Sequence, residues 1–483
     1  MYLLGIDLGT TGCKSMVFDE NGAILGSNYI EYDLIICKDG IEQDAGAWWN
    51  NVVNTVRASI KQSGVSGSEI AALSVSSQGI AFVPVDINGN TLMNAISWLD
   101  TRSTEETAFI KCVCGEKDIF LRTGKTLLPC YVLPQLMWIR RHRPEVYDKT
   151  FKVLMAHDYI VYRMTGKTVT DLSMASGTLA YDIHEQKWMP ELLTRFDIDI
   201  DKLPDLMVFG DVAGTVLPKV AEELGISHAT KVVIGAQDQR CASIGAGIDK
   251  GIFTISLGTS SAIGAICDRP LIDKTMQVTC CGLDRGRWIL ETVVATAGVA
   301  LKWLKNIMFP DLSYMEMDRM AEAAKPLAGG VRFYPHLMAD ASGEAKGSFT
   351  GLSLQTTPQD LIRAVLEGVA YQMRIHIGNM ERIGVVGDEI RLFGGGATSG
   401  IWCRIISDIT GKRVVVPATH ETANLGAAII AGVGAGMFAD FNDAGRMVGK
   451  PGMTVIPDEE NMKIYNEAYT QYEAHNAGIL SNS

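Results

Sequence analysis

The residues with the clearest chemical potential lie near the start of the chain, in the stretch GIDLGTTGCK. Asp7 supplies a carboxylate, and Gly9 lets the backbone approach a ligand closely. Thr10 and Thr11 add hydroxyls to successive N–H groups, and Lys14 adds a cation just beyond the turn. Such a turn can hold phosphate oxygens while the carboxylate organises a divalent cation, directly or through water. For this short motif alone, an ordinary hairpin turn is the alternative.

A second stretch, about half the chain length away, repeats this pattern. LGTTGCKSMVFD, which begins at Leu8, is matched by LGTSSAIGAICD, which begins at Leu257. Both stretches predict a strand, a Gly-Thr turn and a second strand. Gly258 and Thr259 therefore form a second candidate phosphate turn, because two facing turns could clamp one polyphosphate.

A third glycine-rich element is RLFGGGATSG, from Arg391 to Gly400. It follows a predicted strand and precedes the helical pattern of residues 401–410, so a flat base or a phosphate could approach the backbone near a helix N-terminus. The alternative is that these glycines only turn the chain. ATAGVALKWL, which contains Gly298 and Lys302, is a further candidate of this kind.

Asp238, in GAQDQRCASIGAG, directly follows the apolar run KVVIGA. The carboxyl end of a strand is where α/β proteins commonly place ligand chemistry. A carboxylate there can accept the proton of a hydroxyl that attacks a phosphoryl group. A solvated loop residue or helix cap is the alternative. Gln239 and Gln78 carry amides suited to sugar hydroxyls, although a loop amide often contacts only backbone or water.

The elements that must position these residues alternate between strand-like and helical patterns, which predicts an α/β fold with helix-covered sheets. The strand-like runs are LLGID, SMVFD, AALSVS, KVVIGA, FTISLG, AIGAI, RLFGGG and RVVVP. One helix is well signalled, because Thr357 can cap it and Pro358 occupies its first position. Its apolar face is expected to contain Leu361, Val365, Leu366, Val369 and Met373. The repeated turns place a domain boundary near residues 245–250, which divides the chain into 1–247 and 248–483.

Composition narrows the classes of function. The chain has 483 residues, of which 47% are hydrophobic and 20% charged, and its net charge of −12 argues against nucleic acid or an anionic membrane as partner. The apolar stretch from Leu425 to Ala439 is shorter than the roughly 18 to 20 residues that span a bilayer. The N-terminus lacks the pattern of a secretory signal, and the ten cysteines show neither zinc-site nor disulfide-scaffold spacing. We therefore expect a cytoplasmic protein with reduced thiols.

Taken in order, these segments resemble the FGGY carbohydrate kinases, a family within the actin/hexokinase/Hsp70-like ATPase superfamily. The matching blocks are GIDLGTT, SSQG, SWLDTR, DYIVYRMTG with TDLSMASGT, GAQDQ, SLGTSS, GVALKW, GGGATSGIW with SDITGKRV, and NLGAAIIAG. A family signature is also met from Gly347 to Glu367, GSFTGLSLQTTPQDLIRAVLE. The resemblance covers essentially the whole chain.

The resemblance implies two actin-like (ribonuclease H-like) α/β domains with a cleft between them, and it implies ATP and Mg²⁺ as cofactors. Asp238 resembles the catalytic base, and Asp7 the carboxylate beside Mg²⁺. The positions that resemble the nucleotide site are Gly9, Thr10, Thr11, Lys14, Gly258, Thr259, Gly298, Lys302, Gly395, Gly396 and Ala397. The positions that align with the sugar pocket are Gln78, Asp100, Arg102 and Gln239.

The chain departs from the family pattern where substrate specificity is set. Gly79 and Ile80 stand where xylulokinases show Met-His in GQMHG and glycerol kinases show Arg-Glu in NQRET, and Gln135 stands where a lysine is usual. The loss of polar groups at the first two positions removes partners that would discriminate hydroxyl patterns.

We therefore expect the protein to be a kinase that transfers phosphate to a hydroxyl of a small sugar or polyol, most of all a ketopentose such as xylulose. A glycerol, other ketose or signalling-molecule kinase is an alternative within the family. A nucleotide-driven chaperone or filament protein is an alternative from another class, and a catalytically idle sugar sensor is a third. The family resemblance suggests a homodimer, for which the sequence identifies no interface.

Overall fold

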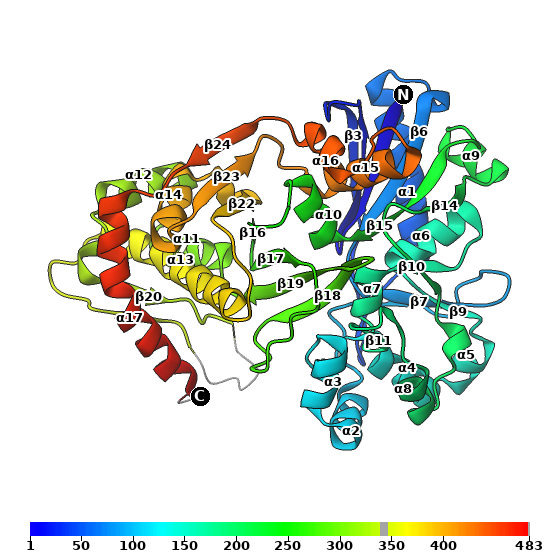
Figure 1. The fold of residues 1–483 in the computed structure, drawn as a ribbon, viewed down its shortest axis with the longest axis horizontal. Coiled ribbons are helices and arrows are strands. Elements are labelled where there is room, and N and C mark those ends of the chain that lie inside the picture. The colour runs from blue at the N-terminus through cyan, green and yellow to red at the C-terminus, as the bar shows by residue number, and fades with distance from the viewer. Residues whose placement is uncertain (339–345, 482–483) are drawn as a thin grey trace. The chain divides into compact units, whose positions relative to one another are not determined.

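The computed structural model describes residues 1–338 and 346–481, and the chain forms two compact units (Figure 1). The first unit comprises Met1–Gly247, Cys267–Ile289 and Glu421–Gly449. The second comprises Ile248–Ile266, Leu290–His420 and Lys450–Ser483. Each unit thus includes segments that are distant in sequence. The division into two contiguous domains, 1–247 and 248–483, stays a prediction.

The first unit is built on a six-stranded sheet in which β15, β6 and β1 are parallel neighbours. In sheet order the strands are β14 (Val212–Thr215), β15 (Lys231–Gln237), β6 (Ile70–Ser77), β1 (Tyr2–Leu8), β2 (Gly12–Phe18) and β3 (Ile24–Glu31). β2 is antiparallel to β1 and to β3, and β14 is antiparallel to β15.

Helices cover both faces of this sheet because side chains alternate along its strands. Leu4, Ile6 and Leu8 of β1 join a buried cluster with the tryptophans and valines of α1 (Ala45–Ser63). Gly5 points to the opposite face, where a Cβ atom would lie 2.2 Å from the carbonyl oxygen of Asn424 in α15 (Thr422–Ala435). The backbone of α15 therefore packs directly on β1, on the same face as Asp7.

The first unit contains further helices and small sheets. Its other helices are α2 (Thr104–Cys114), α3 (Glu116–Thr123), α4 (Val132–His142), α5 (Pro144–Lys149), α6 (Ala156–Thr165), α7 (Leu172–Ser176), α8 (Pro190–Arg195), α9 (Pro218–Leu224), α10 (Asp238–Gly245) and α16 (Phe441–Ala444). A five-stranded sheet has the order β4 (Ile35–Ile36), β5 (Ile41–Gln43), β8 (Ala95–Ile96), β7 (Phe82–Val85) and β9 (Lys152–Met155). The first unit also contains two separate strand pairs: β10 (Val169–Asp171) with β13 (Asp205–Met207), and β11 (Tyr181–Asp182) with β12 (Lys187–Trp188).

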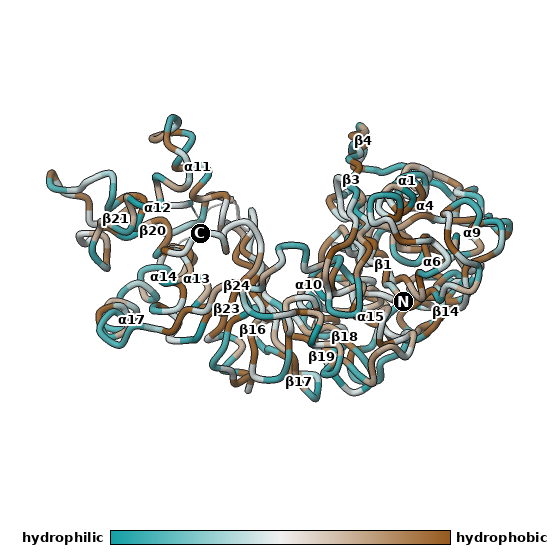
Figure 2. The backbone as a smooth tube through the Cα atoms, turned by 90° about the horizontal axis from the view of Figure 1, so that it is seen from above, coloured by the Kyte–Doolittle hydropathy of each residue, from teal (hydrophilic) through white to brown (hydrophobic). Residues whose placement is uncertain are grey.

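The second unit is centred on β16 (Ile252–Leu257), which pairs in antiparallel fashion with β17 (Ser261–Cys267) and in parallel with β22 (Glu389–Phe393). The order of the sheet that contains β16 is β18 (Thr279–Asp284), β19 (Arg287–Val294), β17, β16, β22, β23 (Arg413–Pro417) and β24 (Pro451–Val455), in which β18 and the first residues of β19 belong to the first unit. A separate pair is β20 (Arg332–Tyr334) with β21 (Ser348–Thr350). The helices of the second unit are α11 (Gly298–Met308), α12 (Tyr314–Ala323), α13 (Pro358–Arg382), α14 (Gly400–Thr410) and α17 (Glu459–Ser481). β1 and β23, one in each unit, are predominantly hydrophobic (Figure 2).

Short 3₁₀ turns complete the described elements: η1 (Gly67–Glu69), η2 (Ile200–Lys202), η3 (Ala328–Gly330), η4 (Gly395–Thr398) and η5 (Gly445–Val448).

The local predictions from sequence are confirmed where their signals were strong. The eight predicted apolar runs all contain strands, and both Gly-Thr turns connect antiparallel pairs. α13 begins at Pro358 after Thr357, whose hydroxyl accepts from the Asp360 N–H while the Asp360 carboxylate accepts from the Thr357 N–H.

Within the described residues, no helix is long and apolar enough to cross a membrane. All ten cysteines are unpaired.

Candidate active site

The predicted chemistry of the first unit gathers at one edge of its sheet. Leu8 at the end of β1 is in register with Ser77 at the end of β6, and Ser77 is in register with Gln237 at the end of β15. Because these strands are parallel, the residues that follow them leave the sheet side by side. Gly9, Gln78 and Asp238 are those residues.

The first turn is held tightly at its base. The Gly9 N–H donates to the Gly12 carbonyl at 2.9 Å, and the Tyr32 hydroxyl donates to the Gly9 carbonyl. Thr10 is fixed from two sides, because its carbonyl accepts from Gln43 Nε2 at 2.7 Å and its hydroxyl accepts from Trp98 Nε1 at 2.8 Å. Thr11 is exposed at the tip. The turn is thus rigid at its base and open to solvent at its tip.

Asp7 lies beneath this turn, opposite Lys14 in the β1–β2 register. Its Oδ1 accepts from Ser76 Oγ at 2.7 Å. Burial raises the pKa of Asp7 to about 6, the Ser76 hydrogen bond and the charge of Lys14 oppose this rise, and the charge of Glu421 adds to it. A desolvated carboxyl with that pKa gains from a nearby cation.

The ammonium of Lys14 is already engaged in the first unit. Its Nζ donates to the two carboxylate oxygens of Glu421 at 2.9 and 3.0 Å. Among the residues that the structure describes, no group of three His, Cys, Asp or Glu side chains could hold a metal. A divalent ion at Asp7 would therefore take most of its ligands from phosphates and water, as Mg²⁺ commonly does. The residues present fit that mode of binding.

Asp238 is the first residue of α10 and directly follows β15. Its Oδ1 accepts from Gln237 Nε2 and, at 2.6 Å, from the Gln239 N–H. Gln239 thus contributes its backbone to the orientation of Asp238, and its side chain is partly exposed. The segment after β6 passes close to Gln237, since a Cβ at Gly79 would lie 3.1 Å from Gln237 Cγ.

Gln78 is buried, and its Nε2 donates to Gln43 Oε1 at 2.9 Å. Its own Oε1 is buried without a hydrogen-bond partner among the described residues. An unsatisfied buried acceptor is costly, and it becomes favourable when a ligand supplies a donor. Gln78 Oε1 is thus an unsatisfied acceptor next to the strand ends, and a hydroxyl would reach it only if the atoms that enclose it move.

Asp100 and Arg102, whose place in the sugar pocket stays a prediction, belong to a buried network of ion pairs and hydrogen bonds. Arg102 Nη2 pairs with Asp100 at 2.8 Å and with Glu42 at 2.9 Å, and only 4% of its side chain is exposed. Asp100 also accepts from the Ile41 N–H at 2.6 Å and from Gln135 Nε2 at 3.2 Å. Gln135, the residue that replaces the usual lysine, thus supports Asp100.

Ile80 has a backbone conformation that β-branched residues rarely adopt, with φ of 56°. Its side chain packs over Gly177, where an added Cβ would lie 2.2 Å from Ile80 Cγ2. The departure from the family pattern therefore places a constrained apolar side chain two residues from Gln78. Backbone outliers of this kind concentrate at functional sites.

The second unit contains a pocket of about 380 Å³ that brings together most of the residues predicted there. Gly258, Thr259, Gly298, Lys302, Gly395 and Gly396 all line it. Ala397 is buried and does not line it. Glycine is required at position 298, because a Cβ would lie 2.4 Å from the Gly258 carbonyl oxygen. That carbonyl accepts from the Gly298 N–H at 2.8 Å, so the turn and the start of α11 form one wall.

Several residues at these sites escaped prediction from sequence. Tyr314, Asp318, Ser399 and Trp402 line the same pocket of the second unit. Ser399 caps α14 and donates to Asp318 at 2.9 Å, and a Ser before a helical run could have indicated that role. Gln43 and Trp98, which fix Thr10, come from distant segments. Trp98 is part of the SWLDTR block, but nothing in that block indicated a contact with Thr10.

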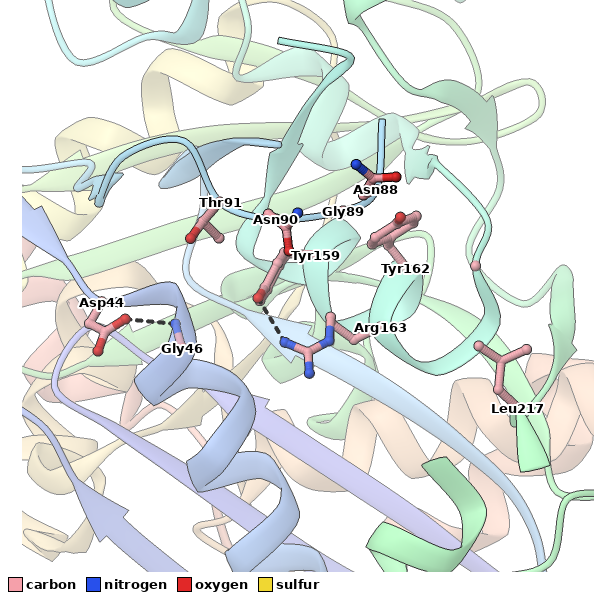
Figure 3. Close-up of a pocket in the computed structure, with 11 residues that line it drawn as sticks. Asp44, Gly46, Asn88, Gly89, Asn90, Thr91, Tyr159, Tyr162, Arg163 and Leu217 are labelled. Carbon is pink, nitrogen blue, oxygen red and sulfur yellow. Dashed lines mark hydrogen bonds between the residues drawn. The ribbon is translucent and has the colours of Figure 1, made fainter. Parts of the chain in front are cut away.

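Another pocket of the first unit, of about 580 Å³, contains none of the predicted residues. It lies between the start of α1, the loop around Asn88 and Asn90, and α6 (Figure 3). Arg163 enters it with its guanidinium 4.6 Å from the Trp49 ring centroid, and Nη1 donates to the Tyr159 hydroxyl at 2.9 Å. Figure 3 shows that Arg163 lies beneath Tyr159 in this pocket.

Comparison with known proteins identifies the family. Residues 2–245 match the N-terminal domain of the FGGY family of carbohydrate kinases, and residues 253–435 match its C-terminal domain. Xylulose kinase of Staphylococcus xylosus is 28% identical over 480 residues, which cover 98% of this chain and 99% of that protein. Gluconokinase of Bacillus subtilis is 28% identical over 510 residues, which cover 99% of each chain.

The fold agrees with these matches. The crystal structure of ligand-bound xylulose kinase from Lactobacillus acidophilus superposes with a TM-score of 0.92 at 26% identity, covering 99% of this chain and 98% of that one. The predicted two-domain α/β fold of the actin-like type is thereby confirmed, and so is the prediction of a phosphotransferase; a kinase family implies the use of ATP. The chain belongs to the FGGY family of carbohydrate kinases.

Proposed function

We propose that this kinase phosphorylates a terminal hydroxyl of a ketopentose such as xylulose, with Asp238 as the general base. The observation that carries the proposal is the row of strand ends formed by Leu8, Ser77 and Gln237. This row aligns a candidate phosphate turn, an unsatisfied amide oxygen and a carboxylate along one edge of the sheet. A kinase for a hydroxyl needs these three functions: hold phosphate, orient the acceptor and remove its proton.

In this mechanism the Asp238 carboxylate takes the hydroxyl proton while the hydroxyl oxygen bonds to the γ-phosphorus of ATP. The bond from that phosphorus to the bridging oxygen breaks in line, and ADP leaves with the electron pair. The N–H of Gln239 and the amide of Gln237 orient Asp238 for this step. N–H groups of the Gly9–Thr11 turn stabilise charge on the transferring group.

Residues predicted to bind the nucleotide occur in both units. Gly258, Thr259, Gly298, Lys302, Gly395 and Gly396, which share the pocket of the second unit, would hold the adenosine and the adjoining phosphates. Asp7 would hold Mg²⁺, which neutralises phosphate charge when bound. Lys14 would contribute to phosphate binding on leaving Glu421.

The predicted sugar pocket favours a neutral substrate. Gln78 Oε1 would accept a hydroxyl hydrogen that no described residue supplies. A gluconate kinase, the second candidate favoured by a relative of equal identity, needs a cation for the carboxylate of its substrate. Arg102 is already neutralised by Asp100 and Glu42, so it offers little to such a group.

A coupled ADP-release assay over pentuloses, hexuloses, gluconate and glycerol tests the substrate class. We expect xylulose to give the highest kcat/KM. Asp238→Asn should abolish sugar phosphorylation and leave ADP affinity unchanged, because the amide keeps the shape but cannot take the proton. Asp249→Asn, the same change at an exposed position, is the matched control. Full activity of Asp238→Asn would refute the role of Asp238, and preference for gluconate would refute the substrate.

The cytoplasmic location and the homodimer expected from sequence are part of this proposal. Ten unpaired cysteines, several of them buried, support a reducing compartment. Sedimentation of the purified protein would test the dimer.

A further inference from the structure

β15, the strand that leads to Asp238, contains a β-bulge. In its parallel pairing with β6, Val233 is opposite Ser74 and Ala236 is opposite Ser76. β15 therefore uses one residue more than β6 over this interval, and the extra residue lies at Ile234–Gly235. A bulge re-aims the residues that follow it. Here those residues are Gln237 and Asp238.

The N–H of the bulged Gly235 is satisfied from outside the sheet. It donates to Nε2 of His157, in the first turn of α6, at 3.1 Å. A backbone N–H can only donate, so Nε2 must be the acceptor and the ring proton must be on Nδ1. Nδ1 donates to Asp158 Oδ1 at 3.0 Å, and Asp158 Oδ2 accepts from the Met155 N–H at 3.1 Å. The side chains of His157 and Asp158 have no solvent exposure.

Close packing leaves the bulge little alternative geometry. A Cβ at Gly235 would lie 1.9 Å from the Val75 carbonyl oxygen of β6. The strand end is also held from α7, because the Gln237 N–H donates to Ser173 Oγ at 3.1 Å. The direction in which β15 delivers Asp238 is therefore fixed by side chains from two helices.

We propose that His157 is a positioning residue of this kinase, which holds the bulge in β15 and thereby sets the location of Asp238. The proposal rests on the proposed role of Asp238 as general base. Loss of the acceptor at Nε2 leaves the Gly235 N–H buried and unpaired, so β15 must shift to satisfy it. A shift of about 1 Å in a reacting group can cost on the order of 100-fold in rate.

Two substitutions separate the two hydrogen bonds of His157. The side-chain nitrogen of Asn overlies Nδ1, so His157→Asn keeps a donor for Asp158 and loses the acceptor for Gly235. The Gln side chain reaches as far as Nε2, so His157→Gln keeps an acceptor for Gly235 and loses the donor. Thr230→Val, which removes a buried 2.9 Å hydrogen bond to the Ile70 carbonyl beside the start of β15, is the control for general destabilisation.

The measurement is steady-state kinetics with ATP and sugar, at a temperature where circular dichroism shows that every variant is folded. We expect His157→Asn to lower kcat roughly 10- to 100-fold with KM for ATP unchanged. His157→Gln should recover most of kcat, and Thr230→Val should retain all of it. If the kcat of His157→Asn lies within twofold of the wild-type value, the proposal is overturned. So would equal losses in all three variants, or a His157→Gln as impaired as His157→Asn.

Asp238→Asn, measured in parallel, distinguishes this proposal from the proposed function. If that variant is inactive and His157→Asn is fully active, only the positioning role fails. If Asp238→Asn is fully active, the assignment of the base fails, and the positioning role fails with it.

Discussion

The substitution Gly298→Ala tests the nucleotide pocket most sharply. The new Cβ would lie 2.4 Å from the Gly258 carbonyl oxygen, which is a backbone atom and cannot move aside as the end of a flexible side chain could. Ordinary contact requires about 1 Å more, so α11 and the Gly258–Thr259 turn must separate. Separation weakens two hydrogen bonds, from the Gly298 N–H to the Gly258 carbonyl at 2.8 Å and from the Val299 N–H to the Thr259 carbonyl at 3.2 Å.

Each of these bonds contributes about 1 kcal/mol, which predicts a KM for ATP raised roughly 10- to 30-fold with a much smaller change in KM for the sugar. The assay is coupled ADP release at saturating sugar with ATP varied. Gly378→Ala is the control, because a Cβ there in α13 meets no atom within 4 Å and should stabilise the helix by about 0.5 to 1 kcal/mol. A KM for ATP in Gly298→Ala within twofold of wild type would refute the assignment of this pocket.

Three further predictions concern other parts of the molecule. Burial, assisted by the charge of His336, lowers the pKa of His376 to about 4, so the folded state is stabilised above the unfolded pKa and loses stability as pH falls from about 6.5 toward 4. Urea unfolding should therefore show a loss of about 2 kcal/mol in the free energy of unfolding between pH 7 and pH 5, and His376→Asn should remove this loss. The same dependence of unfolding free energy on pH in His376→Asn as in the wild type would contradict the prediction. Ile80→Asn should change the ranking of substrates while stability changes by less than about 1 kcal/mol, since relief of the φ of 56° offsets lost apolar packing; an unchanged ranking would count against a role of Ile80 in specificity. Thr357→Ala should cost about 1 kcal/mol in urea unfolding by removing the cap of α13, without affecting KM; an unaltered unfolding midpoint would show that the cap contributes nothing.

Local signals in the sequence were sufficient for much of the fold. The Gly-Thr turns and α13 are specified by residues near one another in the chain, such as Thr357, Pro358 and Asp360, and these elements appear as predicted. The position of Asp238 at a strand end also followed from the apolar run before it.

Features that depend on distant partners could not be predicted. The place of Asp100 and Arg102 in the sugar pocket stays a prediction, but the pairing of Arg102 with Glu42, which lies sixty residues away, had no signal in the sequence. The bulge in β15 depends on His157 of α6, and nothing in KVVIGA marks it. Gln78 Nε2 donates to Gln43, which lies 35 residues away, while Gln78 Oε1 has no partner among the described residues. Each feature depends on a hydrogen bond between residues far apart in the chain, for which periodicity and capping rules carry no signal.

The most direct test of the central claim is a crystal structure of the protein with ADP and xylulose. We predict that one sugar hydroxyl lies within hydrogen-bond distance of the Asp238 carboxylate and that another donates to Gln78 Oε1. A sugar bound away from both residues would contradict the proposed site and mechanism.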